Sequence, residues 1–168
     1  MRLLTVLALF TASLQCQQAI QIKKVEQFYV LGMSVRTENA HEMTGQAKIG
    51  GVWRQFKEQN IGAGKDTYAV YSNYESDQNG PYDYLLGYKT PSVDKIPPGL
   101  TAVKIQTGKY AIVPSEPGPA MKVVPEVWKR IWALTPTELT RPRAFKTDFE
   151  LYRPANADGP VDVFIGLR

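Results

Sequence analysis

One pattern of residues occurs twice in this chain, and this repetition constrains the fold more than any other feature. A Gly-Pro-x-Asp segment begins at Gly80 and again at Gly159, and an apolar run containing a further Gly follows each one. The other matches come earlier in the chain in the same order: Tyr29 with Tyr110, Trp53 with Trp128, and residues 68–71 with residues 149–152. Ordered matches of this kind indicate an internal repeat. We therefore expect two related units, over residues 20–92 and 100–168.

Hydrophobic periodicity predicts the same elements in each unit. Alternating apolar and polar residues predict strands, which in the first unit are residues 20–35, 67–74 and 82–88. Their counterparts in the second unit are residues 100–113, interrupted near Gly108, and residues 144–152 and 161–167. After the first strand of each unit, apolar residues recur at helical spacing. Each unit is thus predicted to run strand–helix–strand–strand.

The two predicted helices differ in detail. The first has an apolar stripe ending at Phe56, with Thr44 as the candidate N-cap. Gly50 and Gly51 lower its helix propensity, so we expect them to serve a close approach of the helix to the sheet. The second helix contains Pro125, which predicts either a helix start or a kink at that position.

Composition excludes several classes of protein. The chain has 168 residues, the length of one domain. A net charge of +4 with scattered basic residues does not indicate a dedicated nucleic-acid binder. The single Cys excludes an intrachain disulfide, and the single His argues against a His-based metal site and His-driven catalysis. We therefore expect no cofactor, no metal site and no catalytic residue.

Residues 1–19 stand apart from the repeats. Residues 3–10 form an apolar run after Arg2, which has the length of a signal-peptide core and is too short to span a membrane. The polar stretch that follows is a poor cleavage site. Residues 1–19 are therefore interpreted as an extension of a cytoplasmic protein or, alternatively, as the signal peptide of an exported one. A single domain is expected over residues 20–168.

The two tandem units resemble the gyrase-inhibitor-like effector-binding domains. The residues that carry the resemblance are Trp128 and Trp132 in the second helix, the segment Phe149-Glu150-Leu151-Tyr152, and the closing apolar strand over 161–167. The resemblance implies an α+β fold in which two pseudo-symmetric units form an antiparallel sheet, with helices on one side and a ligand groove between the units. No DNA-binding helix pair is attached. The chain therefore resembles the stand-alone members, including those on integron cassettes, more than the effector domains within bacterial transcription regulators.

The resemblance also implies a site. An acidic residue on the matching strand of the family commonly meets cationic ligands, and here that residue is Glu150. If Phe149 faces the helices, strand alternation turns Glu150 into the groove, where a ligand cation would offset the cost of a buried carboxylate. Ala69, the repeat counterpart of Glu150, leaves room opposite it. From the residues alone, a solvated Glu150, or one paired with Lys146 or Arg153, is the alternative.

Aromatic side chains are candidates for the walls of this groove. The chain has nine Tyr and three Trp, and such side chains combine an apolar body with a polar tip, which suits a ligand pocket. The same residues also pair on half-buried sheets. Trp53 is assigned to the core. The candidate wall residues are Tyr71, Tyr110, Trp128, Trp132 and Tyr152.

These observations predict non-covalent binding of amphipathic, often cationic, small organic molecules, with Glu150 as the charge partner. The alternative, implied by other members of the family, is a hydrolase of reactive electrophilic molecules in which Glu150 activates water. The sequence shows no nucleophile or oxyanion site for it, so a binding protein is favoured over an enzyme. The expected partner is a small ligand. We expect no direct nucleic-acid binding and no membrane span, and the sequence does not identify a protein partner.

Overall fold

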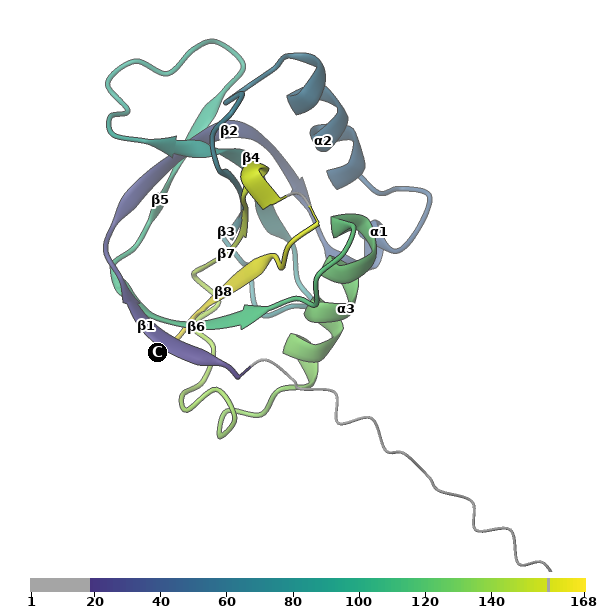
Figure 1. The fold of residues 1–168 in the computed structure, drawn as a ribbon, viewed down its shortest axis with the longest axis vertical. Helices are drawn as coiled ribbons and strands as arrows, with labels where there is room; N and C mark the ends of the chain where they lie inside the picture. Colours follow the sequence, from purple (N-terminus) through teal and green to yellow (C-terminus); the bar gives the residue numbers. More distant parts are fainter. Residues whose placement is uncertain (1–18, 157) are drawn as a thin grey trace, which may run out of the picture.

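The computed structural model describes residues 19–156 and 158–168, and it contains one antiparallel eight-stranded sheet with three α-helices on one side (Figure 1). The predicted α+β class is confirmed, with the order strand–helix–strand–strand occurring twice, as β2-α2-β3-β4 and as β6-α3-β7-β8. In chain order the elements are β1 (Gln21–Val25), β2 (Phe28–Thr37), α1 (Asn39–Glu42), α2 (Ile49–Glu58), β3 (Thr67–Ser72), β4 (Tyr82–Thr90), β5 (Thr101–Ile105), β6 (Gly108–Pro114), α3 (Ala120–Ala133), β7 (Thr147–Tyr152), a short 3-10 turn (Pro154–Asn156) and β8 (Asp162–Gly166).

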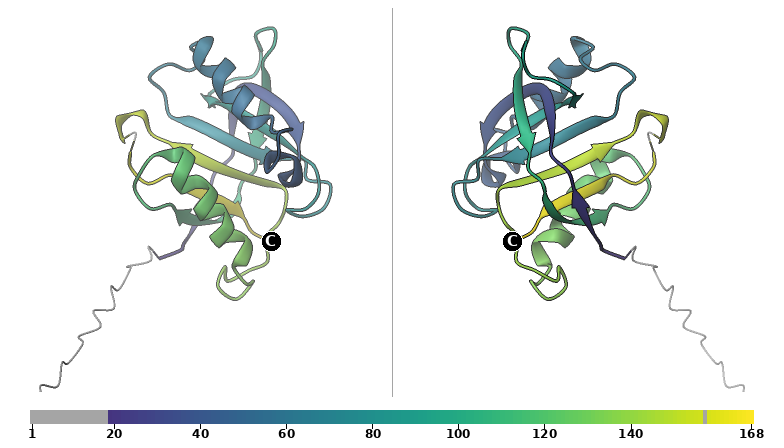
Figure 2. Two further views of the ribbon diagram at one scale, coloured as in Figure 1. Left: turned by 90° about the vertical axis from the view of Figure 1, so that its right-hand side faces the viewer. Right: turned by 90° about the vertical axis from the view of Figure 1, so that its left-hand side faces the viewer.

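The order of the strands shows how the two units join. The sheet runs β1-β6-β8-β7-β3-β4-β2-β5, so the units meet where β7 pairs with β3. At this junction Ala69 is the direct cross-strand partner of Glu150. Helices α2 and α3 both cross the same face of the sheet, one on each side of the junction (Figure 2, left). The middle of the sheet is therefore a boundary between units, flanked by two helices.

Each edge strand of the sheet pairs with a strand from the other half of the chain. The strand expected over 20–35 is two strands, β1 and β2, and the strand expected over 100–113 is β5 and β6. Strand β1 pairs with β6, and β5 pairs with β2. The two connections meet where the Gln27 backbone N–H donates to Thr107 Oγ1 at 3.0 Å. The two halves are thus interlocked through their edges.

Side-chain alternation divides the apolar core between the two faces of the sheet. On the helix face, α2 packs through Val52 and Phe56, and α3 packs through Val127 and Ile131. On the opposite face, the Phe149 and Phe164 rings stack with centroids 4.3 Å apart in a second cluster, around which the sheet curls (Figure 1). Pro125 lies inside α3, which begins at Ala120, so the alternative of a helix start at the proline is wrong.

Helix α2 is capped by a carboxylate, and the expectation of Thr44 as its cap is wrong. Glu42 accepts hydrogen bonds from the backbone N–H of Lys48 at 2.9 Å and of Ile49 at 3.1 Å. The Thr44 hydroxyl instead donates to the carbonyl of His41. A carboxylate placed on the free N–H groups of a first turn satisfies them and interacts favourably with the helix dipole. The unpredicted helix α1 brings Glu42 to this position.

We expect Gly32→Ala to destabilise the protein by about 1–3 kcal/mol, the range for overpacking a close-packed interior. Gly32 and Gly87 are directly opposite each other on β2 and β4. A Cβ on Gly32 would lie 1.9 Å from the carbonyl oxygen of Leu86. The free energy of unfolding in urea measures the effect. The matched control is Gly45→Ala, because no atom lies within 4 Å of a Cβ at that position, and equal stability of the two variants would contradict the β2–β4 register.

Candidate functional site

A cleft lies between α2 and α3, above the junction of β3 and β7. It has two adjoining compartments with volumes of about 570 Å³ and 430 Å³. The larger one reaches Glu150, and we call it the Glu150 compartment. The smaller one reaches Trp128 and Trp132, and we call it the tryptophan compartment. Both are lined by Ile49 and Gly50 of α2, Tyr71 of β3, and Met121, Val124 and Pro125 of α3.

Glu150 lies at the floor of this cleft, and its side chain is almost completely buried, at 1% exposure. Its Oε1 accepts hydrogen bonds from the Tyr71 hydroxyl at 2.8 Å and from Trp128 Nε1 at 2.5 Å. Its Oε2 accepts from the Tyr152 hydroxyl at 2.6 Å. All three donors are neutral. Within the described part of the chain, this carboxylate therefore has hydrogen bonds but no ion pair.

Burial dominates the electrostatics of the cleft floor. Removal from water raises the pKa of Glu150, and the hydrogen bonds from Trp128, Tyr152 and Tyr71 lower it by a smaller amount. Burial also raises the pKa of Tyr71 and Tyr152 well above the usual range, and the nearby Glu150 charge adds to the effect. Both hydroxyls therefore keep their protons at neutral pH and act as donors to the carboxylate.

Glu150 points toward the helices and into the cleft between them, although the condition from which strand alternation placed it in a groove, with Phe149 facing the helices, is not met. Phe149 does not face them but packs into the cluster on the far face of the sheet. Alternation correctly groups Glu150 with Asp148 and Tyr152 on one face. It does not decide which face the helices cover, because β7 is buried on both faces over Thr147–Glu150.

The alternative of a solvated or ion-paired Glu150 is also wrong. Arg153 pairs with Asp162 at 2.7 Å. Lys146 is exposed and borders a cavity on the other face of the sheet. Neither cation reaches the carboxylate.

Five of the six predicted site residues come together in the cleft: Glu150, Tyr152, Tyr71, Trp128 and Trp132. Tyr110 does not. Its ring packs against Phe149 on the far face, with centroids 5.6 Å apart, and its hydroxyl donates to the Gln106 carbonyl. Tyr110 is therefore separated from the cleft by the sheet, and the tyrosine match in the repeat gave no information about its face.

The helix tryptophans reach across the junction between the units. Trp53 of α2 packs edge-on against Tyr152 of β7, with ring centroids 5.0 Å apart. Trp128 of α3 packs edge-on against Tyr71 of β3 at 4.9 Å. Trp53, which was expected to belong only to the core, therefore also lines the Glu150 compartment. Each helix contacts the central strand of the other unit, and this crossed packing closes the cleft around Glu150.

Gly50 has a different role from the expected close approach to the sheet. A Cβ built on Gly50 or on Gly51 meets no atom within 4 Å, so neither glycine is required by packing. Gly50 instead lines both compartments. Its missing side chain leaves the space between the helices open.

Two further cleft residues were not among the predicted ones. Tyr84 lines the Glu150 compartment, and its buried hydroxyl has no hydrogen-bond partner in the described part of the chain. Met121 stands at the rim of the cleft with 92% exposure. Met121 could have been found from spacing, because Met121, Pro125, Trp128 and Trp132 follow one helical stripe. Tyr84 could not, because nothing in the sequence distinguishes it from the neighbouring tyrosines.

Two kinds of feature are absent from residues 19–156 and 158–168. No helix there combines the length and apolar character needed to cross a membrane. No group of three or more His, Cys, Asp or Glu in these ranges is arranged to hold a metal ion.

Known proteins share both sequence and fold with this chain. The family described as integron-associated effector binding protein matches residues 21–167. The integron cassette protein VCH_CASS2, from the mobile metagenome of Vibrio cholerae, is 32% identical with a TM-score of 0.76, over 90% of this chain and 97% of that one. YobU, a candidate transcriptional regulator of Bacillus subtilis strain 168, is 33% identical over 148 residues, which is 82% of this chain and 90% of YobU.

A more distant structure shares the fold alone. SAV2435, solved bound to tetraphenylphosphonium, has a TM-score of 0.70 at 14% identity, over 89% of this chain and 93% of that one. The family match extends over almost all of the described residues, and VCH_CASS2 and YobU support it at the level of sequence. This chain therefore belongs to the integron-associated effector binding family.

Proposed function

We propose that this protein binds amphipathic organic cations in the cleft between α2 and α3, with Glu150 as their charge partner. Binding of a small-molecule effector follows from the family. The positive charge of the ligand and the role of Glu150 are the proposal. The observation that supports it is a buried carboxylate at the floor of a largely apolar cleft, with three neutral donors and, among residues 19–156 and 158–168, no counter-ion.

The energetics of the cleft favour a cation. A buried carboxylate without a counter-charge is costly, and in a low-dielectric site a nearby positive charge interacts with it more strongly than in water. Tyr71 lines both compartments, Trp53 lines the Glu150 compartment and Trp128 lines the tryptophan compartment. Each favourable cation–aromatic contact contributes about 0.5–2 kcal/mol. Apolar side chains such as Met121 and Val124 can cover the rest of the ligand.

SAV2435 supplies a suitable probe. It was solved with tetraphenylphosphonium, a permanently charged ion with four phenyl rings. Because the likeness to SAV2435 concerns only the fold, it does not identify the ligand of this chain. Tetraphenylphosphonium nevertheless has the charge and the aromatic surface that the cleft requires.

The contacts of Glu150 favour binding over the alternative of hydrolysis. A catalytic base must reach a water molecule, and the charge that develops on the substrate needs its own donors. Both oxygens of Glu150 already accept hydrogen bonds, and the donors around it are directed at the carboxylate itself. Recovery of a reactive ligand unchanged after long incubation with the protein would support the binding role.

We expect Glu150→Gln to weaken the binding of tetraphenylphosphonium by about 2–3 kcal/mol, the Coulomb attraction of unit charges about 6–8 Å apart at an effective dielectric constant of about 20. This is a loss of about tenfold or more in affinity. Binding of triphenylphosphine oxide, which is neutral and has a similar aromatic surface, should change little, because it depends on the cleft walls. Calorimetric titration of both ligands measures the difference.

The matched control for this substitution is Glu126→Gln. Glu126 lies on the exposed side of α3, where it pairs with Lys129, so the variant loses the same charge away from the cleft. Equal losses for the cation and the neutral ligand would show that charge is not what Glu150 contributes. Equal effects of the two variants would show that only the net charge of the protein matters.

Affinity for tetraphenylphosphonium should decrease as the pH is lowered through the raised pKa of Glu150, because the carboxyl group becomes neutral. The stability of the unliganded protein should depend on pH in the opposite direction and increase as the pH is lowered. Between the unfolded and the raised folded pKa, the folded state holds more protons, so this group makes the protein less stable as pH rises. Titrations and thermal melts between about pH 5 and 8 test both. Both dependences should be reduced in Glu150→Gln, and an unchanged profile in that variant would contradict the assignment.

We expect Gly50→Leu to reduce the affinity for charged and neutral ligands alike, because the new side chain occupies the space shared by both compartments. The same variant should be more stable by up to about 1 kcal/mol, since Leu favours a helix more than Gly does. Gly51→Leu is the control, because it brings the same gain in helix propensity and Gly51 lines neither compartment. Ligand titration and urea unfolding measure the two effects, and full affinity in Gly50→Leu would place the ligand elsewhere.

A further inference from the structure

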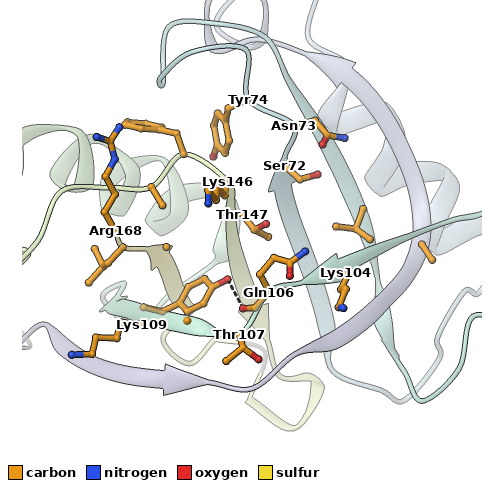
Figure 3. Close-up of a pocket in the computed structure, with 18 residues that line it drawn as sticks. Ser72, Asn73, Tyr74, Lys104, Gln106, Thr107, Lys109, Lys146, Thr147 and Arg168 are labelled. Carbon is orange, nitrogen blue, oxygen red and sulfur yellow. Dashed lines mark hydrogen bonds between the residues drawn. The ribbon is translucent and has the colours of Figure 1, made fainter.

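A second and larger cavity, about 1220 Å³ in volume, lies on the side of the sheet away from the helices (Figure 3). It is bounded by the ends of β3 and β7 and by β5 and β6 with their connection. Tyr110, which the cleft does not include, is part of its wall. The sheet separates this cavity from Glu150, and the lining that it shares with the cleft is Tyr74, which also borders the tryptophan compartment.

The charged side chains that border this cavity are positive. Its border carries Lys104, Lys109, Lys146 and Arg168, and no Asp or Glu of the described residues lines it. None of these four side chains makes an ion pair with a carboxylate side chain in the described ranges. These four cationic side chains are therefore not neutralised by a carboxylate side chain of the described residues.

The carboxylates next to the cavity are already neutralised. Asn73, on the border, donates to Asp83, which pairs with Arg36 at 3.1 Å. Tyr74, also on the border, donates to Asp148, which pairs with Arg143 at 2.8 Å. These neighbouring groups do not cancel the charge of the lysines.

Two buried hydroxyl groups add hydrogen-bonding capacity. Ser72 and Thr147 are cross-strand partners on β3 and β7, and both line the cavity (Figure 3). Ser72 is 4% exposed, and its hydroxyl has no partner in the described part of the chain. A buried hydroxyl without a partner is unusual in folded proteins. A ligand oxygen at this point would satisfy it.

The remaining wall suits an organic group. Tyr74, Phe145 and Tyr110 contribute aromatic surface to the same cavity, and Val103 and Leu167 contribute aliphatic surface. A phosphoryl group offers several charged acceptor oxygens to lysines and hydroxyls, whereas a bare ion would leave the aromatic surface uncovered. We propose that this cavity binds an organic phosphate, with the phosphoryl group near Lys104, Lys146 and the Ser72 hydroxyl, and an aromatic body against the tyrosine and phenylalanine rings.

The test is a titration with adenosine monophosphate, adenosine and inorganic phosphate, followed by NMR chemical-shift changes in the full chain. Adenosine monophosphate should bind and should perturb Ser72, Thr147 and Phe145. The double variant Lys104→Gln/Lys146→Gln should bind it about tenfold more weakly. The matched control Lys95→Gln/Lys122→Gln, at exposed positions that do not line the cavity, loses the same charge and should retain affinity.

Several results would overturn the proposal. The first is a failure of adenosine monophosphate to bind. The second is an affinity for adenosine, which has no phosphate, or for inorganic phosphate, which has no organic body, equal to that for adenosine monophosphate. The third is an equal loss of adenosine monophosphate affinity in the two lysine double variants. Glu150→Gln should leave adenosine monophosphate binding unchanged, because its cleft is on the other face. A loss of nucleotide binding in that variant would place the ligand in the cleft and would also overturn the proposal.

Discussion

The pairing of β3 with β7 is the interaction on which the rest of the molecule depends. It joins the two units into one sheet, and it places Ala69 directly across from Glu150. Because α2 belongs to one unit and α3 to the other, a cleft between units must open above this pair. The crossed contacts of Trp53 with Tyr152 and of Trp128 with Tyr71 then fix the spacing of the helices over it. The site is thus a product of the junction, and neither unit contains it alone.

Strand β7 carries two buried carboxylates whose hydrogen-bond partners differ in charge. Asp148 is fully buried and accepts hydrogen bonds from Arg143, Tyr74 and the Gly166 backbone N–H. Its charge is paired within the protein, which suits a structural role. Glu150 follows two positions along the same face, and within the described part of the chain it accepts hydrogen bonds only from neutral groups. The same strand therefore holds one carboxylate that is paired with an arginine and one that has no counter-charge among the described residues. The second one lies at the cleft.

Sequence periodicity predicted most of the element types, and the resemblance to effector-binding domains implied Glu150 and a groove between the units. The failures of the prediction have physical causes. The repeat predicted two strand–helix–strand–strand units, and the helical stripe brought Trp128 and Trp132 to the cleft. Periodicity could not tell which face of β7 or of β6 meets the helices, since both strands are buried on both faces, and so it misplaced Tyr110 of β6. Periodicity also could not show that β1 pairs with β6 and β5 with β2, each in the other half of the chain. Pairing between strands that are distant in the sequence leaves no local pattern. The role of Gly50 was missed because an absent side chain acts only through the space around it.

The pairing of Ala69 with Glu150 has a consequence for how such a binding site can arise. The repeat match makes these two residues equivalent. In a dimer of two identical chains related by a twofold axis, the same residue would occupy both positions, and two glutamates would face each other as cross-strand neighbours. Like charges at such positions repel, and burial would increase the repulsion. Joining two units in one chain removes this symmetry requirement. A single negative charge can then lie beside the axis of an almost symmetric protein, which gives the cleft a polarity that no symmetric assembly of one unit could have.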